Sequence, residues 1–222
     1  MLAEKKLSIT HINTHDKAGG AAKVAWRLME AQRAEGHNAN MLVGAKMSNS
    51  PYSYSFSLEI DQSVHAHCQQ KGQLFYEYQG SHKLINHPLV RSADVLHLHN
   101  LHGGYFNPFS ISALSHLKPV VWTLHDMQSF TGHCAHSFDC DKWMVTCGEC
   151  PYLDTEPALP VDTTTQLFQD KKLVYEHSCL WVVTPSQWLK NKVERSILRN
   201  QPVELIYNGI DTNIFRPYNK KE

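Results

Sequence analysis

The stretch "KLSITHINTHDKAGGAAKVAWRLMEAQRAEGHNANMLVGA" (residues 6–45) decides the fold of this chain. Its first part, residues 6–14, alternates apolar and polar side chains and is rich in isoleucine and threonine, which predicts a β-strand. A glycine loop follows, and residues 21–36 then carry an apolar stripe at helical spacing and end at a glycine, which predicts a helix. Residues 38–45 predict a second strand. This order forms a β-α-β unit, whose strands are parallel and joined by a right-handed crossover.

Strand and helix patterns continue to alternate along the rest of the sequence. Several predicted strands are almost continuously apolar, as is typical of parallel strands buried on both faces. We therefore predict one α/β domain with a doubly wound, Rossmann-like, mostly parallel sheet of about six or seven strands. Further strands are expected at residues 94–100, 119–126, 180–185 and 203–209, helices within 61–92 and at 108–117, 164–177 and 187–198, and a loop at 47–58.

The composition narrows the class of protein. The chain has 222 residues, of which 42% are hydrophobic, so it can bury a substantial core. Basic and acidic residues balance at 21 each, so nothing points to nucleic acid or an anionic membrane as the main partner. The opening "MLAEKKLSITHI" lacks the apolar run of a secretory signal, and no stretch approaches the roughly 18 apolar residues of a membrane span. We expect a cytoplasmic protein, in which clustered cysteines bind metal more often than they form disulfides.

Residues that directly follow the strands are the candidates for a ligand site, because doubly wound sheets bind ligands beyond the carboxyl ends of their strands. After the first strand, Gly19 and Gly20 precede a helix whose N-terminus offers free amides to an anion. The spacing matches neither G-x-G-x-x-G nor the P-loop. A plain tight turn explains these two glycines equally well.

The segment "HLHNLHGGYF" marks a second strand end. His97 and His99 alternate with leucines and share one face, whereas Asn100, His102 and Gly103 lie past the strand, where a ligand would bind. A three-histidine metal site is one interpretation of this segment. No acidic partner is evident in the sequence, so we prefer to interpret His97 as a hydrogen-bonded interior residue.

The segment "PVVWTLHD" places His125 and Asp126 at a third strand end. A histidine in this position can titrate near neutral pH, move protons or hold a sugar hydroxyl. Asp126 could orient that histidine or accept a hydrogen bond from a ligand hydroxyl. No G-x-S-x-G sequence supplies the nucleophile of a hydrolase triad.

A long irregular segment, residues 127–162, contains four of the six cysteines. Such a segment buries little apolar area and needs another restraint. The cysteines follow the spacing C-x5-C-x6-C-x2-C, and its final C-x2-C is typical of a zinc half-site. They are Cys134, Cys140, Cys147 and Cys150. We predict one structural zinc ion bound by these four thiolates; disulfides are the main alternative, unlinked cysteines come third, and His133 or His136 could replace one cysteine.

Six segments together resemble the amino-terminal half of a glycosyltransferase family 4 enzyme with the GT-B fold. The segments are "GGAAKVAWRL", "LHLHNLHGGYFN", "PVVWTLHDMQSFTGHCAHSFDCDKW", "CGECP", "VVTPSQWL" and "YNGIDTNIFRP". They span residues 19–217 and agree with the family in order and spacing. The histidine-glycine and Trp-Thr-Leu-His-Asp segments are most similar to the branch that builds bacterial exopolysaccharides, including colanic-acid-type enzymes.

The resemblance implies a reaction. Enzymes of this family transfer a sugar, here of the hexosyl type, from a nucleotide-sugar donor to a glycan or lipid-linked acceptor, with retention of anomeric configuration. No catalytic metal and no covalent protein nucleophile are expected. The resemblance places His125 close to the transferred sugar, in a positioning and electrostatic role, with Asp126 behind it.

The resemblance also implies positions for the substrates. Gly19 and Gly20 would lie near the donor diphosphate, across a cleft between two domains. Asn100, His102 and Gly103 would line the acceptor side.

Family members have two Rossmann-like domains, and the carboxyl-terminal one binds most of the donor through a basic pair and a Glu-x7-Glu motif that we do not find here. We expect residues 1–217 to form the acceptor-side domain, with a cysteine-rich insertion at 127–162, and residues 218–222 to begin a linker. The chain alone is then expected to be inactive without a donor-binding domain in cis or in trans. The alternative is a non-catalytic acceptor-binding or scaffold subunit that pairs with a separate donor-binding chain. A lipid-linked acceptor would bring the protein to the inner face of the membrane, with peripheral contact at most.

Overall fold

Seven parallel strands form a single sheet in the order β3-β2-β1-β4-β5-β6-β7. The computed structural model describes residues 5–56 and 60–217, so the linker expected at 218–222 lies outside the described residues. The strands are β1 (Ser8–His15), β2 (Asn38–Ala45), β3 (Ser53–Ser55), β4 (Val95–Leu98), β5 (Val120–Thr123), β6 (Leu180–Thr184) and β7 (Val203–Leu205). The predicted α/β, Rossmann-like architecture is confirmed.

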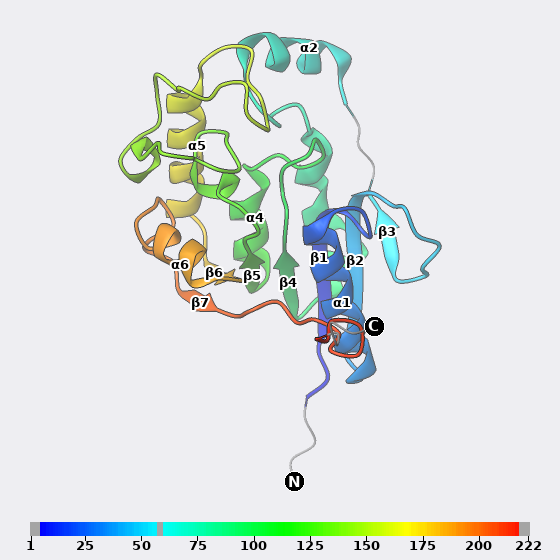
Figure 1. Ribbon diagram of the computed structural model, residues 1–222. Helices are drawn as coiled ribbons and strands as arrows, with labels where there is room; N and C mark the ends of the chain where they lie inside the picture. Colours follow the sequence, from blue (N-terminus) through cyan, green and yellow to red (C-terminus); the bar gives the residue numbers. More distant parts are fainter. Residues whose placement is uncertain (1–4, 57–59, 218–222) are drawn as a thin grey trace.

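Helices connect the strands. Figure 1 shows α1 against β1 and β2, and α4, α5 and α6 gathered at the other half of the sheet. The helices are α1 (Gly20–Ala34), α2 (Gln62–Lys71), α3 (Pro88–Ser92), α4 (Ser110–Leu117), α5 (Thr164–Glu176) and α6 (Gln187–Val193), with 3-10 helices η1 (Gln79–Asn86), η2 (Gln128–Phe130) and η3 (Lys142–Met144). No helix in the described part of the chain is long and apolar enough to cross a membrane.

The strand order reverses beside the central strand. From β1 the chain adds β2 and β3 on one side, and it then returns to add β4 to β7 on the other side. The carboxyl ends of β1 and β4 therefore flank the topological switch point, which is where open α/β sheets bind ligands. The parallel register of these two strands places His11 directly beside His97.

Each face of the sheet has its own apolar core. Under α1, the side chains of Ala25 and Met29 pack on Ile9, Met41 and Val43 from β1 and β2. The larger core lies on the opposite face, where residues of α3, α4, α5 and α6 pack against the sheet. Burial on both faces explains why the strands are nearly continuously apolar.

The structure differs from the sequence prediction in a few element bounds. β3 lies within residues 47–58, which we expected to be a loop; it pairs over three residues with β2, so the free edge of β2 rather than its own pattern creates the strand. The predicted helix 187–198 ends at Val193. Its predicted N-cap is confirmed, because Ser186 Oγ accepts a hydrogen bond from the Leu189 N–H at 3.2 Å.

Candidate functional site

Four of the residues selected from the sequence meet at the carboxyl edge of the sheet. Asn100 and His102 follow β4, and His125 and Asp126 follow β5. All four line one small pocket of about 10 Å³, which also includes His99. Neighbouring parallel strands bring these loops together, since their carboxyl ends lie at the same edge.

Asp126 pairs with His102 rather than with His125. Its Oδ2 lies 2.8 Å from His102 Nε2, and its Oδ1 accepts a hydrogen bond from the Gln128 N–H at 2.9 Å. Burial opposes ionisation of Asp126. The hydrogen bond from His102 and the electrostatic interactions with His102 and His125 outweigh this effect and hold the pKa of Asp126 below its ordinary value. The sequence analysis offered Asp126 as an orienting group for His125 or as an acceptor for a ligand hydroxyl, and in the structure its hydrogen-bonded side-chain partner is His102.

The loop after β4 is tied to the end of β1. Thr14 Oγ1 lies within hydrogen-bond distance of the carbonyl oxygens of Asn100 (3.1 Å) and His102 (2.7 Å), and Asn13 Oδ1 accepts from the Asn100 N–H at 3.0 Å. Gly103 has φ +101°, and a Cβ there would come within 2.9 Å of Thr14 Cγ2. A side chain at position 103 would push this loop away from β1, so packing against Thr14 explains the glycine there without any ligand.

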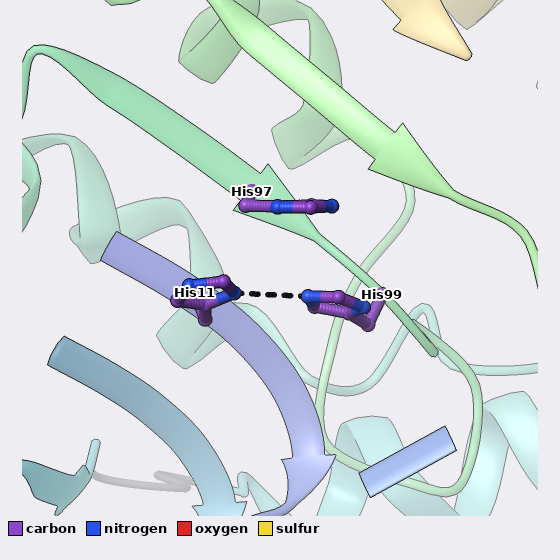
Figure 2. Close-up of side chains that lie close together, drawn as sticks. All are labelled: His11, His97 and His99. Atoms are coloured by element: carbon purple, nitrogen blue, oxygen red, sulfur yellow. Dashed lines mark hydrogen bonds between the residues drawn. The ribbon is translucent and has the colours of Figure 1, made fainter. Parts of the chain in front are cut away.

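Three buried histidines lie beside this site (Figure 2), and Gln32 of α1 contacts one of them, His11. His11 Nδ1 faces His99 Nε2 at 3.0 Å, and His97 stacks on His99 with ring centroids 4.3 Å apart. His97 Nε2 lies 2.8 Å from Thr123 Oγ1, so the interpretation of His97 as a hydrogen-bonded interior residue is confirmed. His11 was missed by the sequence analysis, because it lies within a strand and only the β1–β4 register brings it to His97.

The row of histidines continues to His125. His99 Nδ1 lies 3.4 Å from His125 Nε2, and the two ring centroids are 5.6 Å apart. Burial lowers the pKa of His125 to about 4, although the Asp126 carboxylate raises it and His102 lowers it further. His125 is therefore neutral near pH 7, so one of its ring nitrogens donates a hydrogen bond and the other accepts one.

The histidine cluster has the donors for a metal but not the orientation. Within residues 5–56 and 60–217, His11, His97 and His99 form the only group of three or more His, Cys, Asp or Glu side chains whose ligand atoms all lie within 4.8 Å. Their rings are stacked with interplanar angles of 19–26°, and His97 lies above the line from His11 to His99 in Figure 2. An imidazole binds a metal in its ring plane, so these lone pairs do not converge. The geometry favours hydrogen bonds, and His102 stays outside the group because it pairs with Asp126.

Gly19 and Gly20 lie at the start of α1 rather than in the pocket. Gly19 has φ +88° and is the N-cap of α1, with no side-chain cap. A Cβ added to either glycine meets nothing within 4 Å, so no neighbouring group of the described chain requires glycine here for space. The helix N-terminus is open, as an anion-binding role would need.

The four clustered cysteines line one small cavity of about 20 Å³ together with His133. Cys147 Sγ accepts a hydrogen bond from the Gly132 N–H at 3.1 Å, and Cys150 Sγ lies 3.4 Å from His133 Nε2. All six cysteines of the chain are free thiols. Burial raises the pKa of Cys147 to about 12. Within the described part of the chain, no three of these sulfurs all lie within 4.8 Å of one another.

The two histidines near these cysteines, His133 and His136, have different surroundings. His133 is 1% exposed, and its Nδ1 donates to the Pro157 carbonyl at 2.8 Å, which leaves Nε2 directed at Cys150. His136 instead stacks on Trp188 and accepts from the Phe138 N–H, and it is not part of the cavity wall. Of these two histidines, His133 is the one that lines the cavity and could replace a cysteine as a ligand.

A parallel sheet with polar side chains gathered at its switch-point edge defines a Rossmann-like ligand-binding domain. The sequence profile of Glycosyltransferase Family 4 matches residues 18–214. The chain therefore belongs to glycosyltransferase family 4.

Two known proteins illustrate this relationship. The chain is 28% identical over 226 residues to "Putative colanic acid biosynthesis glycosyl transferase WcaC" of Escherichia coli (strain K12), an alignment that covers 92% of this chain and 55% of that protein. The chain thus spans about half the length of this curated relative. Its fold is similar to the crystal structure of Anabaena Alr3699/HepE in complex with UDP and glucose, with a TM-score of 0.50 and 12% identity over 96% of this chain and 47% of that one.

Proposed function

We propose that this chain is the acceptor-binding half of a retaining glycosyltransferase that transfers a hexosyl group from a nucleotide-sugar to a glycan or lipid-linked acceptor in polysaccharide biosynthesis. The proposal is supported by family membership and by the name of the colanic-acid relative. The observation that carries it is the convergence of Asn100, His102, His125 and Asp126 in one pocket at the switch-point edge. Ligands of this fold class bind there.

The residues take different roles in this proposal. His125, neutral and partly buried, holds a sugar hydroxyl beside the reacting centre and acts by position and electrostatics rather than as a nucleophile. The Asp126–His102 pair presents a fixed charge distribution to the acceptor, and Asn100 and Gly103 shape its loop. Gly19 and Gly20 leave the N-terminus of α1 open to the donor diphosphate. No metal takes part in the transfer itself.

The proposal includes a second domain. A donor-binding domain, in cis or in trans, must close on this edge before the sugar can be transferred, since transfer needs both substrates held in one geometry. The chain alone is then inactive. In this proposal the sugar transfer takes place in the cytoplasm, and a lipid-linked acceptor brings the protein to the inner face of the membrane by peripheral contact.

The test measures transfer from a panel of UDP- and GDP-sugars to an acceptor extract, with and without the donor-binding domain. We expect product only when both domains are present, with the donor's anomeric configuration retained. His125→Ala should then lower turnover by about 100-fold, the usual loss when a group that stabilises transition-state charge is removed. His116→Ala, on the exposed side of α4, is the matched control. Turnover by the chain alone, an inverted product, or near-normal turnover of His125→Ala would each contradict a named part of the proposal.

We also propose that the cavity in the cysteine segment binds one structural zinc ion through Cys134, Cys140, Cys147 and Cys150. The cavity of about 20 Å³ has room for one ion, and the sulfurs must move inward to about 3.8 Å from one another to bind it at normal zinc–sulfur distances. Gly148 and Glu149 both have positive φ, so Cys147 and Cys150 are joined by the tight turn that a half-site needs.

The environment of the cavity supports the zinc proposal. Lys171 is buried beside it and donates to the carbonyl oxygens of Gln128, Thr131 and Gly132, which brings a positive charge close to the sulfurs. A tetrathiolate zinc site carries net negative charge, so this cation would offset part of it. Zinc would thereby hold the segment that follows His125 and Asp126.

Elemental analysis of protein purified without added metal tests this site. We expect about one zinc per chain, its loss in Cys147→Ser and Cys150→Ser, and its retention in the control Cys179→Ser, whose thiol is exposed outside the segment. Zinc loss in His133→Ala together with retention in a single cysteine variant would replace that cysteine by His133. A chain free of zinc, and lighter by two hydrogens for each bridge, would establish disulfides instead.

A further inference from the structure

A continuous row of polar side chains connects α1 with the candidate catalytic histidine. Gln32 of α1 places its Oε1 2.7 Å from His11 Nε2. The row then runs from His11 Nδ1 to His99 Nε2 at 3.0 Å, and from His99 Nδ1 to His125 Nε2 at 3.4 Å. Figure 2 shows the middle contact, between His11 of β1 and His99, which directly follows β4.

The hydrogens in this row have only one consistent direction. An amide oxygen accepts hydrogen bonds and cannot donate them, so the N–H of His11 must be on Nε2. A neutral imidazole has one N–H, which makes His11 Nδ1 an acceptor for the Nε2–H of His99. By the same step, His99 Nδ1 accepts from the Nε2–H of His125.

The surroundings keep these rings neutral and fixed. His11 and His99 are 0% and 2% exposed, and burial lowers the pKa of His11 to about 4 and holds that of His99 well below its ordinary value. His97 stacks on both rings, and the Trp122 Nε1–H donates to the His99 carbonyl at 2.8 Å. The row therefore has little freedom to change partners.

We propose that Gln32, His11 and His99 are positioning residues that hold His125 in its Nε2–H tautomer and leave His125 Nδ1 as a bare acceptor. Gln32 sets the direction of these hydrogen bonds, because its amide oxygen is the one atom of the row that can only accept.

The consequence for substrate rests on the proposed function. With Nε2–H directed to His99, the remaining ring nitrogen of His125 can only accept a hydrogen bond. It selects a hydroxyl that donates, as a sugar hydroxyl does, and it disfavours a ligand group that can only accept. A wrong tautomer would present an N–H to the same ligand and lose this preference.

The tautomers can be measured directly on the 222-residue chain by long-range ¹⁵N–¹H correlation NMR of the histidine rings. We expect His11, His99 and His125 all in the Nε2–H form in the unchanged protein. Gln32→Leu removes the acceptor and should give a mixture of His125 tautomers. Gln32→Glu keeps an acceptor oxygen and should preserve the Nε2–H form. Gln32 is only partly buried on α1, so both variants should fold, which backbone amide spectra check.

Two results would overturn the proposal: an Nδ1–H form of His125 in the unchanged protein, or an unaltered His125 in Gln32→Leu. In an active two-domain enzyme, Gln32→Leu should raise KM by about twofold with little change in kcat, since equal tautomer populations leave half of the free molecules competent to bind the substrate, which then selects them. Gln32→Glu should restore KM. If the tautomers behave as expected but His125→Ala retains normal turnover, the proposed function fails and the positioning of His125 stands.

Discussion

Acid should destabilise this protein through its buried histidines before it protonates the carboxylates. His11 is fully buried, and its pKa is about 4 in the folded protein and 6.5 in the unfolded chain. The folded state therefore binds fewer protons than the unfolded state between these values, and stability falls as the pH falls. For His11 alone the loss of stability from pH 7.5 to 4.5 is about 2–3 kcal/mol, from roughly 1.4 kcal/mol for each pKa unit.

Other groups near His11 act in the same direction. Burial also holds the pKa values of His97 and His99 well below the ordinary value, and that of His125 lies at about 4. Protonation of each of these histidines in the unfolded chain lowers the stability of the folded protein in the same direction as the pH falls. Asp126, whose pKa is lowered, contributes only at lower pH, because its stabilising effect is lost as the pH falls below the ordinary value of 3.8.

The contribution of His11 can be isolated by substitution. Urea unfolding followed by tryptophan fluorescence gives the free energy of unfolding at pH 7.5 and at pH 4.5 for the unchanged protein and for His11→Asn. We expect the difference in unfolding free energy between the two proteins to change by about 2–3 kcal/mol in favour of the variant at the lower pH. Contributions that both proteins share, including those of the cysteine segment, cancel in this difference.

A neighbouring substitution provides the control. Ile12→Val, in the same strand, removes one buried methylene and should cost about 1 kcal/mol at both pH values. If the unchanged protein and His11→Asn lose stability in parallel between pH 7.5 and 4.5, His11 does not have a lowered pKa and the reasoning is refuted.

Three further predictions concern stability. Gly44→Ala should destabilise the fold by about 1–3 kcal/mol, because the new Cβ would lie 2.5 Å from Tyr105 Cβ; Gly20→Ala, which meets nothing within 4 Å, should differ by less than about 0.5 kcal/mol in the same urea experiment. Asp16→Asn should cost about 1–3 kcal/mol, because the buried carboxylate accepts hydrogen bonds from the Met47 and Ser48 amides and from the Ser48 hydroxyl; thermal unfolding would show an unchanged midpoint if these bonds contribute nothing. Trp122→Phe should leave the His99 carbonyl without its indole donor and cost about 1–3 kcal/mol by urea unfolding, whereas the same change at the half-exposed Trp181 should have little effect.

Much of the fold could be predicted from local patterns. The predicted bounds of β2, residues 38–45, agree with the structure, and the predicted start of α5 at Thr164 does too. β3 could not be predicted, because three residues of an edge strand owe their conformation to the free edge of β2. β4 and β5 were predicted to extend two and three residues too far, because the backbone leaves the hydrogen-bonded sheet where the site loops begin.

The candidate site was predicted only in part. Residues after strand ends were selected correctly as neighbours, because the topology of a parallel sheet brings all carboxyl ends to one edge, and Asn100, His102, His125 and Asp126 do share a pocket. Their partners were not predictable. Asp126 is next to His125 in sequence, yet it turns to His102, which is far away along the chain.

The sequence by itself determined the order of strands and helices apart from β3, the edge of the sheet at which the site lies, and the family, because these depend on hydrophobic periodicity and on short motifs that are local in the chain. Only the tertiary structure decided which donor meets which acceptor. The row from Gln32 through His11 and His99 to His125 joins helix α1, strand β1 and the two segments that follow β4 and β5. Its existence depends on the parallel register of β1 and β4 and on the packing of α1 above them, and its direction depends on a single amide oxygen. Hydrogen bonds act over about 3 Å, so a sequence pattern can propose such residues, and only the folded chain can pair them.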